Sequence, residues 1–261
     1  MYYLLLFLIL IYILASSLLY YLQEKSIFYP TTLPQDYEFN EFENAEEVFL
    51  PISEDVQLHA LHFKVPNPKG LILYFHGNTN GLEGWGYMAE PFIKLGYNVF
   101  MPDYRGFGKS KGKLGRNVLH KDADQWYDHV SKLYDPKGIV FYGRSLGSGV
   151  ACSLATRHIP RLLLLETPFY SILSLAEASR PFLPVRWLLK YPMRSDLNIQ
   201  KVNCPVHLFH GTADAYVPYE QAVKLAEAYG DKSILHTYEG GTHGNLNTFP
   251  TFQQKVRELL G

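Results

Sequence analysis

The chain has 261 residues, 47% of them hydrophobic, which suits one large α/β domain with a packed core or two small ones. Its 24 lysines and arginines nearly balance 25 aspartates and glutamates, so the chain has no excess of positive charge that would attract nucleic acid. Cys152 and Cys204 form no Cys-x-x-Cys pair, and no His-Glu-x-x-His spacing is present. We therefore expect neither a metal site nor a nucleic-acid partner.

Residues 1–22 contain no charged side chain, and a helix of about 20 apolar residues is long enough to cross a bilayer. Tyr2, Tyr3, Tyr20 and Tyr21 stand at its two ends, where an aromatic belt belongs. A cleaved signal peptide is the alternative, but such a segment usually has a basic start and a shorter apolar core. We predict a retained, single-pass transmembrane anchor and a membrane location.

An acidic, proline-containing connector over residues 23–46 precedes a region, 47–261, in which short apolar runs alternate with helical patterns. This alternation predicts an α/β fold, with a mostly parallel sheet covered by helices on both faces. The expected strands are an antiparallel hairpin over 48–52 and 56–63, then 70–75, 98–102, 138–142, 162–165, 206–209 and 234–238. The expected helices are 82–95, 118–133, 148–155, 219–229 and 251–260.

One stretch departs from this alternation. Between Glu166 and Val206 lie nearly forty residues with no glycine, and they include four prolines by Pro192. We predict a small helical cap over residues 168–201, inserted above the sheet. Its apolar side chains could line an acyl pocket or could simply pack onto the domain. The candidate substrate contacts in this cap are Phe169, Tyr170 and Trp187.

The pentapeptide Gly143-Arg144-Ser145-Leu146-Gly147 lies between an apolar strand pattern and a run of small residues typical of a closely packed helix. A serine on so sharp a strand-to-helix turn has its hydroxyl exposed, and the flanking glycines prevent a collision between the two backbones. The pentapeptide alone also occurs in ordinary glycine-rich loops. Its strand-turn-helix context makes Ser145 the candidate nucleophile.

A serine hydroxyl needs a base to take its proton and a third group to orient that base. Both partners should follow strands at the carboxyl edge of the sheet. Asp214 lies one short loop beyond a predicted strand, and His243 lies on the loop after the last one. We predict Asp214 as the acid and His243 as the base. Glu166 is an alternative acid, and His210 is expected to be a packed or hydrogen-bonded residue.

The oxygen anion of a tetrahedral intermediate requires preorganised N–H donors. The backbone N–H of Leu146, at the start of the expected helix, is one candidate. The second is the N–H of Asn78, which follows a predicted strand within His76-Gly77-Asn78, with Thr79 as the fallback. These residues are therefore the predicted oxyanion hole.

With these motifs the chain resembles the α/β-hydrolase superfamily over roughly residues 47–261, and the order nucleophile, acid, histidine is that of this superfamily. It is most similar to the serine-aminopeptidase-like branch that includes membrane-anchored α/β-hydrolase domain proteins. The matching segments are His76-Gly77-Asn78, 103–110, 143–149, 210–214 and 240–243. The resemblance implies hydrolysis of an ester, thioester or amide through an acyl-enzyme on Ser145, without a cofactor.

The expected substrate is an acyl-containing small molecule or lipid. Peptidase and acyl-protein thioesterase activities are alternatives within the enzymes. Relatives that deacylate membrane-attached proteins have an N-terminal cysteine cluster, whereas this chain has no cysteine before Cys152. A catalytically silent hydrolase fold, serving as a membrane-tethered binding module, is the alternative from another class.

Overall fold

The computed structural model describes residues 1–115, 117–230 and 233–261, and within them eight strands form one sheet in the order β1-β2-β4-β3-β5-β6-β7-β8. The hairpin β1–β2 is antiparallel, β2 also runs antiparallel to β4, and the other neighbours are parallel. The mostly parallel sheet is thus confirmed. The strands are β1 (Ala45–Ser53), β2 (Val56–Phe63), β3 (Leu71–Phe75), β4 (Asn98–Pro102), β5 (Ile139–Arg144), β6 (Leu162–Glu166), β7 (Val206–Gly211) and β8 (Ser233–Tyr238).

The register of the central strands places two of the predicted motifs together. β3 and β5 are buried along their whole length, which explains their continuous apolar sequences. They pair in parallel, with Leu73 opposite Phe141 and Phe75 opposite Gly143. The loop after β3 therefore leaves the sheet beside the turn that carries Ser145.

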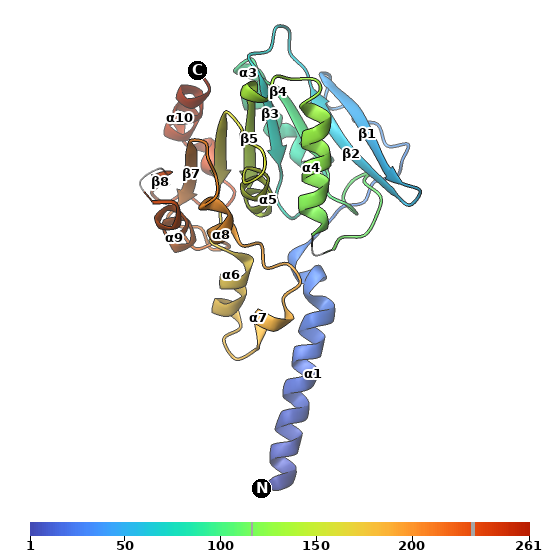
Figure 1. Cartoon of the computed structure of the whole chain (residues 1–261), viewed down its shortest axis with the longest axis vertical. Coiled ribbons are helices and arrows are strands. Elements are labelled where there is room, and N and C mark those ends of the chain that lie inside the picture. The colour runs from blue at the N-terminus through green and yellow to red at the C-terminus, as the bar shows by residue number, and fades with distance from the viewer. Residues whose placement is uncertain (116, 231–232) are drawn as a thin grey trace.

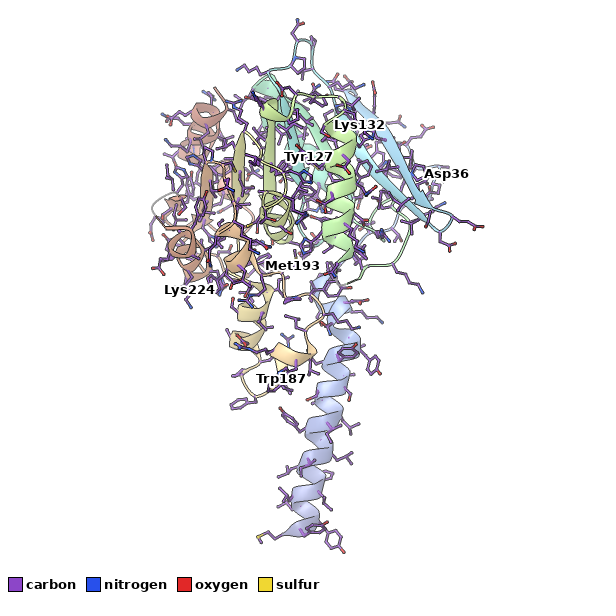
Figure 2. The ribbon with its side chains drawn as sticks, in the orientation of Figure 1. Asp36, Tyr127, Lys132, Trp187, Met193 and Lys224 are labelled. Atoms are coloured by element: carbon purple, nitrogen blue, oxygen red, sulfur yellow. The ribbon has the colours of Figure 1, made fainter. Side chains whose placement is uncertain are left out.

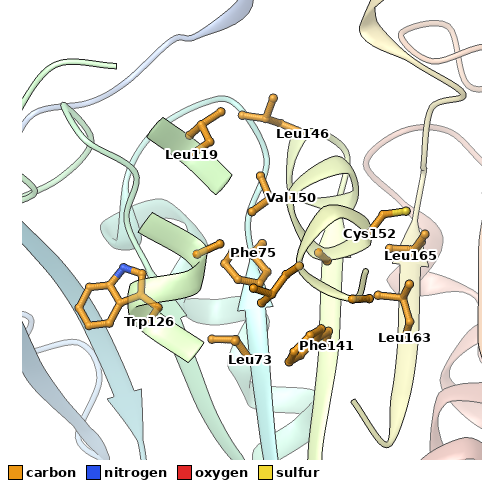
Figure 3. Packing of buried hydrophobic residues seen from close by; sticks show 14 of the residues in the cluster. Leu73, Phe75, Leu119, Trp126, Phe141, Leu146, Val150, Cys152, Leu163 and Leu165 are labelled. Carbon is orange, nitrogen blue, oxygen red and sulfur yellow. The ribbon is translucent and has the colours of Figure 1, made fainter. Parts of the chain in front are cut away.

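Helices cover both faces of the sheet, as predicted. On one face, Val150 of α5 and Leu119 of α4 converge on Phe75 of β3 (Figure 3). Burying such side chains stabilises the fold by roughly 1.5–3 kcal/mol each. The helices on that face are α4 (Val118–Val130), α5 (Leu146–Leu154), α8 (Ser195–Ile199) and α9 (Glu220–Tyr229). The other face is covered by α2 (Leu82–Trp85), η1 (Gly86–Ala89), α3 (Glu90–Lys94), η4 (Leu246–Thr248) and α10 (Pro250–Leu260).

The single helix predicted over 82–95 is divided into α2, η1 and α3. Gly84 and Gly86 lower the helix propensity of its first half, and Pro91 begins a new helix because a proline is favoured in a first helical turn. A side chain at Gly86 would also collide with Phe42, since its Cβ would lie 2.4 Å from that ring.

Residues 168–201 contain α6 (Ile172–Ser179), α7 (Val185–Leu188) and α8. α6 and α7 pack against each other and stand outside the body, beside α1 (Figure 1). α8 instead contacts α5 and α9 and buries Ile199, so it belongs to the layer over the sheet. We use "cap" below for α6, α7 and the loops on either side of them, residues 168–194.

The helix α1 (Tyr2–Ile27) projects from the body and is about 39 Å long (Figure 1). In the described part of the chain it is the one helix long and apolar enough, by length and composition, to cross a membrane. It continues five residues beyond the predicted anchor. The chain after it stays on the body, because Tyr29 and Thr32 form bridges with Thr79 and Gly108.

Candidate active site

Ser145 lies between the last residue of β5 and the first residue of α5. Its φ of 52° and ψ of -116° are a strained conformation for a residue with a side chain, and such strain is concentrated at functional sites. The turn is held because the N–H of Ser145 donates to the carbonyl of Glu166 at 2.9 Å. Glycine is required on both sides: a Cβ at Gly143 would lie 2.4 Å from the carbonyl oxygen of Gly147, and one at Gly147 would lie 2.0 Å from that of Phe75.

The side chains of Ser145, His243 and Asp214 form one hydrogen-bonded chain. Nε2 of His243 lies 2.9 Å from the Ser145 hydroxyl, and Nδ1 lies 2.7 Å from Oδ2 of Asp214. An ionised carboxylate only accepts hydrogen bonds, so Nδ1 carries the proton and Nε2 is left to accept from the serine. The structure thus brings the three predicted residues together in the geometry that a nucleophile, its base and an orienting acid need.

The surroundings of Asp214 keep its carboxylate charged. Burial by itself raises the pKa of this group, but hydrogen bonds from His210, His243 and the Val217 N–H lower it more, so that the pKa lies well below its usual value. Oδ1 also accepts from the N–H groups of Tyr216 and Val217, each at 2.9 Å. His210 is buried and hydrogen-bonded, as predicted, with Nε2 at 2.8 Å from the Val217 carbonyl oxygen.

Leu146 and Asn78 both line the cavity beside Ser145. The described residues provide no hydrogen-bond acceptor for the backbone N–H of either one, which leaves both donors available to a ligand. The loop that carries Asn78 is held from two directions. Its side-chain amide donates to the carbonyl of Ile27 at 2.6 Å, and its own carbonyl accepts from the N–H of Tyr29 at 2.8 Å.

Comparison with known proteins agrees with this architecture. A family model described as serine aminopeptidase, S33, matches residues 66–194. Lysophosphatidylserine lipase ABHD12 of Danio rerio is 30% identical over an alignment of 208 residues, and the match covers 72% of this chain and 54% of that protein. The structure of alpha/beta hydrolase domain-containing protein 10 from mouse has a TM-score of 0.61 with this chain at 20% identity. The match covers 82% of this chain and 96% of the mouse chain. The chain belongs to the α/β-hydrolase superfamily.

A second structure, the Pyrococcus furiosus esterase Pf2001, has a TM-score of 0.68 with this chain at 19% identity. The match covers 90% of this chain and 97% of the esterase chain. This likeness supports the fold alone. The chain spans about half the length of the ABHD12 relative that it matches, 54%. The predicted fold class and family are thus confirmed, and the predicted hydrolase agrees with the names of these relatives.

Glu166, the alternative acid, binds other groups in this superfamily member. Its Oε2 accepts from the Tyr142 hydroxyl at 2.5 Å, and its Oε1 lies 3.3 Å from Nε of Arg144. Arg144 in turn donates to the backbone carbonyl of His243 at 3.1 Å and lies over the ring of Trp85, 5.2 Å from its centroid. Sequence reasoning missed Arg144, because the residue before the serine is variable in the motif and carries no signal of its own.

A cavity of about 900 Å³ opens onto Ser145 and His243. Of the candidate substrate contacts, Phe169 lines it, whereas Tyr170 and Trp187 are not among the described residues that form its wall. Tyr170 packs against the core, and Trp187 is 83% exposed at the end of the cap beside α1 (Figure 2). Sequence reasoning also missed part of the wall that comes from α1 and the residue after it: Leu19, Gln23, Ser26, Ile27 and Tyr29.

In the described residues there is no group of three or more histidine, cysteine, aspartate or glutamate side chains arranged to hold a metal ion. Cys152 and Cys204 are both buried thiols, and burial raises the pKa of both. A buried thiol with a raised pKa is protonated and unreactive at neutral pH.

Proposed function

We propose that this chain is a membrane-anchored serine hydrolase that cleaves carboxylic esters, with lipid esters as the main substrate class. The hydrogen-bonded chain Asp214–His243–Ser145, at the end of a largely apolar cavity, is the observation that carries the proposal. The similarity to a lysophosphatidylserine lipase supports a lipid ester over a peptide.

The proposed reaction has two halves. His243 Nε2 takes the proton of the Ser145 hydroxyl as its oxygen attacks the ester carbonyl, and Asp214 stabilises the charged imidazole. The N–H groups of Leu146 and Asn78 stabilise the developing oxyanion, each by about 10²–10³ in rate. His243 then protonates the departing alcohol, which leaves an acyl group on Ser145. In the second half His243 deprotonates a water molecule, which releases the fatty acid and restores the serine.

We further propose that residues 1–22 are a single-pass anchor and that residues 47–261 form the catalytic domain. The anchor is supported by the length of α1 and by its exposed apolar side chains. Its polar end is set by the ion-pairing Glu24 and by Lys25, directly before the body. The catalytic serine is then held close to a membrane surface.

A fluorophosphonate probe tests the serine mechanism. It should label the wild-type chain, and Ser145→Ala should abolish labelling and lower kcat for ester hydrolysis by at least about 10³-fold. Ser179→Ala, a change at another serine on the cavity wall, is the matched control and should remain labelled.

Two outcomes would count against the proposal. Ester turnover by Ser145→Ala at the wild-type rate would disprove the serine mechanism. A folded wild-type chain that neither reacts with the probe nor hydrolyses any ester would instead indicate a silent binding module.

A further inference from the structure

The end of α1 lies against the cap and lines the same cavity as Ser145. The less exposed positions of α1 in this region recur every three or four residues, so they share one face of the helix. These positions are Ala15, Ser16, Leu19, Gln23, Glu24 and Ile27. Three of them, Leu19, Gln23 and Ile27, also form part of the cavity wall.

Gln23 fastens this face to the cap. It is 3% exposed, although it belongs to a helix whose apolar side chains are mostly exposed. Its amide nitrogen donates to the carbonyl of Leu188 at 3.1 Å, and its amide oxygen accepts from the N–H of Lys190 at 2.6 Å. Because one side chain satisfies both a donor and an acceptor of the cap backbone, α1 has a defined position next to α7.

Neighbouring contacts reinforce this position. Glu24 accepts from the Tyr191 hydroxyl at 3.0 Å and lies 3.7 Å from the ammonium group of Lys190. Phe28, just after α1, packs edge-on against the Tyr191 ring, with 5.0 Å between the centroids. A helix that served only as a tether would need none of these contacts.

The wall contributed by α1 reaches from the reacting serine to the far part of the cap. At one end, Ile27 is hydrogen-bonded to Asn78 in the predicted oxyanion hole. At the other end, Leu19 lines the cavity together with Ala178 and Leu188 of the cap. The cavity therefore continues from the catalytic residues to the space between α1 and the pair α6–α7.

The outer part of the cap carries large apolar side chains on the side of the molecule from which α1 projects. Phe182 is 89% exposed and Trp187 is 83% exposed, and Figure 2 shows Trp187 beside α1. Exposed aromatic side chains beside a membrane-spanning helix are suited to the lipid–water interface. This end of the cavity consequently lies close to the membrane surface.

We propose that α1 is part of the substrate site: with α6 and α7 it forms a channel for one acyl chain of a single-chain membrane lipid ester, with the ester carbonyl at Ser145. The inference rests on the proposed esterase function. A volume of about 900 Å³ falls within the ~300–1,000 Å³ of typical small-molecule sites. Because Gln23 bonds α1 to the cap on the side of α7, residues of α1, α6 and α7 line one shared cavity, which we assign to one acyl chain.

Leu19→Trp, which enlarges a side chain on the channel wall, tests this role of α1. We expect the ratio of kcat/KM for palmitoyl over butyryl p-nitrophenyl esters to fall at least about tenfold, because the larger side chain occupies the path of the long chain. Leu18→Trp is the matched control: Leu18 is adjacent, 60% exposed and outside the described wall, so the ratio should stay at the wild-type value.

Leu19→Ala is a second test, which does not require the fold to accommodate a larger side chain. This variant should raise the ratio of kcat/KM for palmitoyl over butyryl esters. In liposomes, the full-length wild type should hydrolyse a monoacylglycerol at least about tenfold faster than the matching diacylglycerol. An unchanged palmitoyl-to-butyryl ratio in both Leu19 variants, or equal rates on the two lipids, would overturn the inference while fluorophosphonate labelling persists. Loss of labelling in the wild type would overturn the proposed function itself.

Discussion

Replacement of Asp214 by asparagine tests the hydrogen-bonded chain at its buried end. Oδ1 of Asp214 accepts from two backbone N–H groups at 2.9 Å, and an asparagine oxygen would keep both bonds. The asparagine NH₂ would then face Nδ1 of His243, which lies 2.7 Å from the present Oδ2. Because the NH₂ group donates, Nδ1 would have to accept, the imidazole proton would move to Nε2, and Nε2 could no longer accept from Ser145.

The wrong tautomer lowers kcat by about 10⁴-fold in a serine triad, which corresponds to about 5.4 kcal/mol of transition-state stabilisation. We expect this loss in Asp214→Asn. Glu166→Gln is the matched control, because Glu166 binds Arg144 and Tyr142 and was the alternative acid. It should lower kcat by less than about 10²-fold, since it leaves the tautomer of His243 unchanged.

The assay is steady-state hydrolysis of p-nitrophenyl butyrate by both variants, with thermal unfolding measured to establish that each is folded. If Asp214→Asn retained kcat within about tenfold of the wild type, the carboxylate would not orient His243. If folded Glu166→Gln lost more activity than Asp214→Asn, the acid would be Glu166, and the reasoning from the contacts would be refuted.

Two further predictions concern stability. Gly147→Ala should lower the free energy of unfolding by about 1–3 kcal/mol and also reduce kcat. The methyl group of the alanine would lie 2.0 Å from the Phe75 carbonyl oxygen and would displace the loop that carries Asn78. An unchanged melting temperature would contradict this expectation. Burial raises the pKa values of Asp103 and Asp214, but hydrogen bonds from their histidine partners lower these values by more, so the net pKa of each carboxyl is below normal. Each carboxylate therefore stabilises the fold fully above its unfolded pKa of about 4. This contribution is lost as the pH falls through the lowered pKa of the folded state. Urea unfolding between neutral pH and pH ~3 should show the decline below about pH 4, and a flat profile would count against it.

Much of the fold could be predicted from local patterns. A buried parallel strand must be apolar on both faces, so β3 and β5 are recognisable as short continuous runs. Gly143 and Gly147 are recognisable because the turn at Ser145 leaves no room for a Cβ. The positions of Asp214 and His243 after successive strands followed from the same alternation, since parallel strands bring their carboxyl ends to one edge of the sheet.

Contacts between distant parts of the chain decided the rest. Glu166 is the last residue of one buried strand and Asp214 follows the next, and only the neighbours of each in space show that Arg144 binds one and His243 the other. The assignment of α8 to the sheet layer likewise depends on its packing against α5 and α9. The clearest case is α1, whose sequence indicates only an apolar helix. The bonds from Gln23 to the cap join residues up to 167 positions apart, and no pattern within residues 1–27 indicates that this helix reaches the wall of the active-site cavity.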